Sequence, residues 1–214
     1  MVDSYGSNRR TAIVRAASEV FARDGYFDTR LVDIAAEAGC SVGTVYTYFE
    51  GRDELLREVF RQVEAEMKQT GEIPSGAGAW KSIAASNRSY LESYRKNAKF
   101  MGLLEQVSHA DSEFRKLREE RAKSFIQRNA HWLRSLRADG RLDPSVDVDM
   151  MAAALSATVS RMAYAAWVDR TMGDSEDLLE RILATVNRIW WASLGIVPEW
   201  VGKGDDLPVK GKGV

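Results

Sequence analysis

The sequence predicts an all-α protein of about nine helices, and three observations lead to this fold class. Only four of the 214 residues are proline, so long stretches lack the residue that most often breaks a helix. Apolar side chains recur every three or four residues along most of the chain, which is the spacing of one helix face. No segment shows the apolar–polar alternation of a half-buried strand.

The first 60 residues predict four helices separated by glycines. Gly25, Gly39 and Gly51 each follow an apolar-periodic segment, as a glycine after a helix end commonly does. Thr29 and Ser41 are the candidate N-caps of the second and third helices. Residues 1–8 are polar and are expected to form a disordered arm. The expected helices are Arg9–Asp24, Arg30–Ala38, Val42–Phe49 and one that starts near Arg52 and runs toward Gln69.

The rest of the chain predicts five more helices and two irregular segments. Residues 70–78 are rich in glycine and proline and are expected to form a loop, and residues 197–214 a flexible tail. The expected helices are Ala79–Lys96, Ala98–His109, Ser112–Leu136, one opened by residues 143–149 and reaching about Met172, and Ser175–Leu194.

Composition places the chain among ordinary soluble globular proteins. Apolar residues make up 45% and charged residues 29% of the sequence. The one cysteine, Cys40, cannot form an intrachain disulfide, which fits a reducing cytoplasm. No apolar run of about 18 residues is present, and the N-terminus lacks the apolar core of a secretory signal. We therefore expect a cytoplasmic protein with no membrane partner.

The two short helices after Gly25, joined by a tight glycine-containing turn, have the arrangement of a helix-turn-helix. In this motif the second helix enters the major groove of DNA. At 100° per residue, Val45 and Phe49 share the face that packs inward, flanked by Val42 and Tyr48. The opposite face presents small or hydroxyl-bearing side chains that can approach base edges and phosphates, namely Gly43, Thr44, Tyr46 and Thr47.

This segment resembles the N-terminal domain of the TetR family of transcriptional regulators over roughly residues 9–58. The residues that match in register are Phe21, Gly25, Thr29, Ile34, Ala35, Ala38, Gly39, Ser41, Gly43, Thr44, Tyr46, Tyr48, Phe49 and Leu55. The resemblance implies a dimeric DNA-binding repressor whose recognition helix contributes Val42, Gly43, Thr44, Tyr46, Thr47 and Tyr48. It also implies that Arg52, at the start of the next helix, binds a phosphate.

Two positions depart from the family pattern, and the local charge opposes DNA binding. Val32 and Val42 stand where relatives often carry polar residues, so Arg30, Arg9 and Arg10 are expected to share the phosphate contacts. The first 60 residues hold seven arginines against ten acidic residues, and the whole chain has a net charge of −1. DNA binding therefore requires that these charges be segregated by face.

The C-terminal region predicts a helical bundle with many aromatic and methionine side chains. Such side chains can line a ligand pocket, although each of them equally fits an ordinary core. The candidate pocket residues are Trp80, Phe100, Met101, Leu104, Phe125, Met162 and Trp167, which favour a hydrophobic small-molecule ligand. The last two helices are apolar on more than one face, so we expect them to pair with a second copy in a homodimer. The two histidines, His109 and His131, have no partner at metal-ligand spacing, so no metal and no cofactor are expected.

Three functions compete on this evidence. The first is a ligand-released transcriptional repressor with a DNA-binding domain over residues 9–54 and a ligand-binding and dimerisation domain over 55–196. The second is a helical enzyme, against which stands the lack of any nucleophile elbow, phosphate-binding glycine loop or metal motif. The third is an interaction adaptor that keeps the fold without binding DNA, as the acidic N-terminal balance allows. We therefore expect a regulator and not an enzyme.

Overall fold

The computed structural model describes residues 3–69 and 79–195, and side chains within 8–67 and 81–195. Over these ranges it contains helices and no strand, which confirms the predicted all-α class. No helix in them is both long and apolar enough to span a membrane. The helices are α1 (Asp3–Asp28), α2 (Leu31–Glu37), α3 (Val42–Tyr48), α4 (Arg52–Gln69), α5 (Ala79–Lys96), α6 (Ala98–Ala110), α7 (Ser112–Ala138), α8 (Val148–Trp167) and α9 (Leu178–Leu194).

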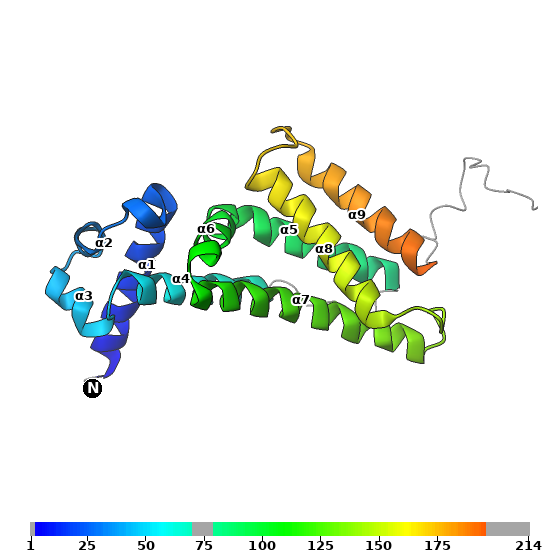
Figure 1. Ribbon diagram of the computed structural model, residues 1–214, viewed down its shortest axis with the longest axis horizontal. Helices are drawn as coiled ribbons and strands as arrows, with labels where there is room; N and C mark the ends of the chain where they lie inside the picture. Colours follow the sequence, from blue (N-terminus) through cyan, green and yellow to red (C-terminus); the bar gives the residue numbers. More distant parts are fainter. Residues whose placement is uncertain (1–2, 70–78, 196–214) are drawn as a thin grey trace, which may run out of the picture.

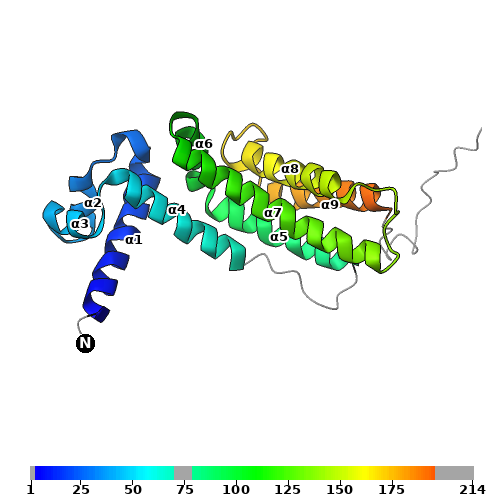
Figure 2. The same cartoon turned by 60° about the horizontal axis from the view of Figure 1, so that its bottom comes forward.

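The helices form two groups that α4 connects (Figure 1). Helices α1 to α3 form a small head at one end of the molecule, and α5 to α9 form an elongated bundle at the other. Figure 2 shows that α4 starts inside the head and runs along the bundle, beside α5 and α7. The residues drawn in grey between α4 and α5 include the loop predicted for 70–78, and these residues, like those predicted as a tail, lie outside the described part of the chain.

The first helix begins earlier than predicted and breaks where predicted. It starts at Asp3, so the disorder expected for residues 1–8 is wrong from that residue on. The segment contains no proline, and an acidic residue in the first turn favours a helix start through the helix dipole. Gly25 interrupts α1 with φ 79° and ψ 178°, a conformation that a residue with a Cβ rarely adopts.

One predicted cap is confirmed and one is wrong. Ser41 accepts a hydrogen bond from the backbone N–H of Thr44 at 3.1 Å and so caps α3. Thr29 does not cap α2, whose N-cap is Arg30 and has no side-chain cap bond. Instead the buried Thr29 hydroxyl donates to the carbonyl of Gly25. The break at Gly25 leaves that carbonyl without its helical hydrogen bond, and the Thr29 hydroxyl supplies the missing donor.

Helix α8 is shorter than predicted at both ends. Asp143 accepts from the backbone N–H of Ser145 in a separate turn, so the helix starts only after its cap, Asp147. It ends at Trp167 rather than near Met172. Two backbone bonds from the following segment close the last turn, and the chain then reverses through Arg170, which has a positive φ of 54°.

A single apolar core runs through the head and the bundle. Where they meet, the fully buried Phe114 of α7 lies edge-on to Phe60 of α4, with ring centroids 5.9 Å apart, and to Tyr26 of the head, 6.3 Å away. Phe60 in turn lies edge-on to Phe100 of α6 at 6.4 Å. Within the bundle, the buried amide of Asn87 on α5 donates to Asn187 on α9 at 2.9 Å.

Gly102 of α6 packs closely against Val168, the residue that follows α8, which gives the first prediction. A Cβ added there would lie 2.9 Å from Cγ1 of Val168, so Gly102→Ala should lower the free energy of unfolding by about 1–2 kcal/mol despite the better helix propensity of alanine. Thermal and urea unfolding measure the change. Adding Val168→Ala should recover part of the loss.

The matched control is Gly43→Ala, in another helix, where the added Cβ would meet only an ordinary contact at 3.6 Å. This variant should be as stable as the parent or more so. Equal effects at both glycines would show that the α6–α8 contact does not constrain residue 102.

Candidate functional site

The third helix presents the face that the sequence predicts. Val45 and Phe49 are buried, at 0% and 2% exposure, against α1 and α2. Tyr46 is 57% exposed and points into solvent with Gly43 and Thr47, while Thr44 is half-buried. The Thr47 hydroxyl donates to the carbonyl of Gly43 at 3.1 Å, so its oxygen keeps both lone pairs to accept hydrogen bonds. The exposed face of α3 is therefore small, polar and uncharged.

The remaining predicted DNA-contacting residues lie around this face in different environments. Val42 and Tyr48 are half-buried against the core at the two ends of α3. Arg30 is exposed, and its guanidinium donates to both carboxylate oxygens of Asp33 at 2.9 Å. These bonds lower the pKa of Asp33 below its ordinary value. Val32 is 51% exposed on α2, so an apolar side chain stands beside the polar face.

Arg52 at the start of α4 is turned inward. Its Nη1 donates to the carbonyls of Thr29 at 3.1 Å and Phe27 at 3.4 Å, and its guanidinium carbon lies 4.2 Å from the ring centre of Tyr26. The Tyr26 hydroxyl donates to Asp53 at 2.7 Å. In this conformation Arg52 ties the start of α4 to the turn between α1 and α2.

Several arginines of the head are held in ion pairs with its acids. Arg10 pairs with Glu58 at 2.9 Å, which lowers the pKa of that carboxyl, and its guanidinium lies 5.0 Å from the Phe49 ring centre. Arg23 pairs with Asp24 and with Glu37 at 2.9 and 3.1 Å. Each pair neutralises one base together with one acid, so the net negative charge of the first 60 residues remains.

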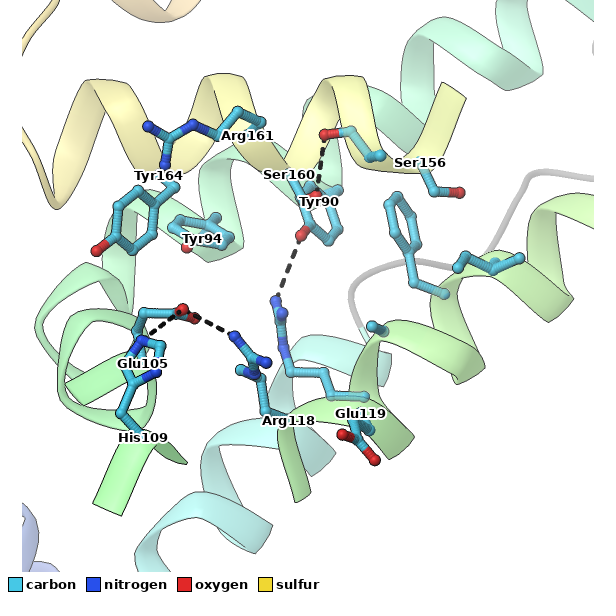
Figure 3. Close-up of a pocket in the computed structure, with 15 residues that line it drawn as sticks. Tyr90, Tyr94, Glu105, His109, Arg118, Glu119, Ser156, Ser160, Arg161 and Tyr164 are labelled. Carbon is cyan, nitrogen blue, oxygen red and sulfur yellow. Dashed lines mark hydrogen bonds and ion pairs between the residues drawn. The ribbon is translucent and has the colours of Figure 1, made fainter. Parts of the chain in front are cut away.

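The bundle contains an open pocket of about 580 Å³ between α5, α6, α7 and α8 (Figure 3). Its apolar wall includes Tyr90 and Phe125, whose rings stack with centroids 4.3 Å apart. At one end Glu105 accepts from Arg118 at 2.8 Å and lies 3.5 Å from His109. Its other lining residues are Tyr94, Glu119, Arg121, Ala122, Ile126, Ser156, Ala157, Ser160, Arg161 and Tyr164.

The structure brings only one of the predicted pocket residues, Phe125, into this lining. Met101 and Leu104 border a gap of about 10 Å³, and Phe100 is buried in the core. Met162 and Trp167 are half-buried and pack against the core. The side chain of Trp80 lies outside the described residues.

Sequence reasoning missed the polar half of the pocket. Arg118 and Arg121 stand one turn apart on α7, and Phe125 follows four residues later on the same face. In the sequence, this spacing of two arginines and a phenylalanine on one helix face was the sign of a partly polar pocket wall. A smaller cavity of about 290 Å³ adjoins the pocket and shares Tyr90, Arg121 and Phe125 with it. In the described part of the chain, no group of three His, Cys, Asp or Glu is placed to hold a metal ion.

Comparison with known proteins matches residues 13–59 to the family described as bacterial regulatory proteins, tetR family. The regulator HbdR of Aromatoleum sp. (strain CIB) is 38% identical over 66 residues, which are 31% of this chain and 28% of that protein. The uncharacterised regulator YhgD of Bacillus subtilis (strain 168) is 37% identical over 62 residues, 29% and 32% of the two chains. The chain thus covers about a third or less of the length of these relatives. The repressor KstR2 of Mycolicibacterium smegmatis is 26% identical over 163 residues, 69% of this chain and 74% of that one.

Solved structures share the whole fold. The putative TetR-family regulator from Mesorhizobium loti MAFF303099 superposes with a TM-score of 0.74 at 19% identity, over 88% of this chain and 97% of that chain. The FadR regulator from Bacillus subtilis in complex with stearoyl-CoA gives 0.69 at 21% identity, over 88% and 99%. The likeness therefore extends over the bundle as well as the head.

The inward position of Arg52 gives the second prediction. Arg52→Ala should lower the free energy of unfolding by about 1 kcal/mol, because it removes two charge-assisted hydrogen bonds and a cation–π contact that are half-exposed to water. Chemical denaturation measures the loss. Arg30→Ala is the control and should cost less than about 0.5 kcal/mol, since it breaks only an exposed pair with Asp33. Equal stability of the two variants would contradict the anchoring role of Arg52.

Proposed function

We propose that this chain, which belongs to the tetR family of bacterial regulatory proteins, is a transcriptional repressor that binds operator DNA as a homodimer and is released by a small molecule. The observation that carries the proposal is the uncharged, exposed face of α3, formed by Gly43, Tyr46 and Thr47. Small hydroxyl-bearing side chains on an exposed helix fit the width of the major groove and the hydrogen-bonding groups of base edges.

We assign the phosphate contacts to groups at the edges of the exposed α3 face. Arg30 is exposed and held only by an i,i+3 pair with Asp33, which a phosphate can replace. The N-terminus of α4, opened by Arg52, adds free backbone N–H groups that attract an anion. Val42 and Tyr48 complete the recognition surface at the two ends of α3.

We assign DNA binding to residues 9–54 and ligand binding with dimerisation to residues 55–196. A regulator of this kind works in the cytoplasm and is not an enzyme. The KstR2 relative is named a transcriptional repressor, and the FadR neighbour is described with bound stearoyl-CoA. Both support a repressor whose bundle binds a small, largely apolar molecule.

The switch follows from the continuity of α4, which runs unbroken from Arg52 in the head to Gln69 beside the bundle. Its Glu64 and Met67 line the smaller cavity, so a ligand there contacts the helix that carries the head. A shift of α4 changes the spacing of the two recognition helices in a dimer. By linkage, the ligand then weakens DNA binding by the same factor by which DNA weakens ligand binding.

The third prediction tests DNA recognition. A duplex selected from a random library by the parent protein should bind Thr47→Ala at least tenfold more weakly, because the variant loses a hydroxyl and a methyl group at the base edges. The melting temperature should barely change, since the hydroxyl bonds only within its own helix. Ser135→Ala, which removes an equivalent exposed hydroxyl bonded to the carbonyl of Trp132, is the control.

Equal affinity of the Thr47 and Ser135 variants would contradict the proposed recognition face. Failure of the parent protein to enrich any duplex would favour the alternative of an interaction adaptor that keeps the fold.

The fourth prediction tests assembly through α8 and α9, which lie on the outer side of the bundle (Figure 1). Their exposed positions include the small or apolar residues Ala154, Ala157, Ala184, Ile189 and Ala192, beside charged residues such as Arg181 and Arg188. Ile189→Glu should convert a dimer to a monomer in sedimentation experiments, because it places a charge inside the interface. Ser135→Glu, on the exposed side of α7, should leave the dimer intact. A dimer that tolerates glutamate at 189 would place the interface elsewhere.

A further inference from the structure

Two arginines of α7 lie inside the bundle without an acidic partner among the described residues. Arg128 is half-buried, its Nε has no hydrogen-bond partner, and its guanidinium lies 5.3 Å from the ring centre of Phe125. Burial lowers the pKa of Arg128, and no carboxylate acts against that effect. Arg121 donates to the hydroxyl of Tyr90 at 3.5 Å and to the sulfur of Met67 at 3.9 Å, and its guanidinium lies 5.6 Å from the ring centre of Tyr94.

Two other arginines of α7 do pair with carboxylates. Arg118 pairs with Glu105 at 2.8 Å, and Arg134, further along α7, pairs with Asp149. Leaving a buried or half-buried cation without a counter-charge costs stability. Among the described residues, neither Arg121 nor Arg128 forms an ion pair, although Glu64 lines the same cavity.

The two side chains share one cavity. They are seven residues apart on α7, two turns along the same helix face, and both line the cavity of about 290 Å³ between α4, α5 and α7. Phe125 lies between them in the sequence and stacks on Tyr90 of α5. The remaining lining residues are Glu64, Met67 and Ser124.

We propose that the effector of this regulator carries an acidic group that binds between Arg121 and Arg128, with its apolar body against Tyr90, Phe125 and Met67. The proposal rests on the proposed function only in calling the molecule an effector. Guanidinium groups bind the paired oxygens of a carboxylate or a phosphate through parallel hydrogen bonds. The stacked rings and the thioether offer apolar contact to the rest of the molecule.

This site also connects the ligand to α4. Glu64 lines the same cavity from that helix, so the bound acid adds negative charge on the side of the cavity where α4 packs. Like charges repel most strongly where water is scarce. A bound acid thus changes the charge environment of α4, the helix that carries the head.

The test uses matched probes on the full chain. Calorimetry and thermal unfolding compare 4-phenylbutanoate with its uncharged amide, 4-phenylbutanamide, and with inorganic phosphate. The acid should bind at least tenfold more tightly than the amide and raise the melting temperature. A stronger effect of phosphate than of the carboxylate would identify a phosphorylated effector as the source of the same anion chemistry.

Three variants distinguish a role of these arginines in anion binding from a role in the stability of the fold. Arg121→Met and Arg128→Met should each weaken binding of the acid at least tenfold and leave the melting temperature of the unliganded protein unchanged or raised, because they remove an unpaired charge. Arg134→Met is the control on the same helix: it breaks the pair with Asp149 and should leave anion binding intact.

Equal binding of acid and amide, or no binding of either anion, would overturn the proposal. So would a fall in the unliganded melting temperature of Arg128→Met greater than that of Arg134→Met, since Arg128 would then be structural. Binding of the selected duplex is measured on the same proteins without probe. If the parent protein selects no duplex, the proposed function is wrong, and the anion result still stands. If the parent protein binds its selected duplex but shows no anion effect, only this inference is wrong.

Discussion

The packing of Phe114 against Tyr26 and Phe60 holds the two halves of the molecule together. This ring is fully buried in the first turn of α7, where Asp111 caps the helix by accepting from the backbone N–H of Glu113 at 2.7 Å. The same helix carries Arg121 and Arg128 about two and four turns further on. The turn of the head that Arg52 anchors and the wall of the pocket are therefore joined by one rigid element. A change at either end reaches the other through direct van der Waals contact.

The sequence predicted the head and most helix bounds because glycines and caps act locally. Gly25 and Gly39 both adopt the positive φ that their positions imply, and Ser41 caps α3 as expected. Thr29 was misjudged because its hydroxyl serves a carbonyl four residues earlier, a need created only by the break at Gly25. The orientation of α3 was predictable because two large apolar side chains four residues apart fix its inner face.

The pocket was harder to predict because it depends on packing between helices far apart in sequence. Large apolar residues such as Phe100 and Leu104 were expected to line it, but they filled the core instead, as the hydrophobic effect favours. A cavity forms where side chains cannot fill the space between helices, and here long charged side chains of α7 line that space. Sequence shows which residues are apolar but not which of them meet across α5 and α8.

The ion pairs of the head affect how strongly the protein would bind DNA of arbitrary sequence. Arginines that are held by Glu58, Asp24, Glu37 and Asp33 contribute little free positive charge to attract phosphates of arbitrary sequence. Non-specific affinity comes almost entirely from such attraction. For the proposed repressor, the paired arginines and the uncharged face of α3 would lower the non-specific affinity with which specific binding competes.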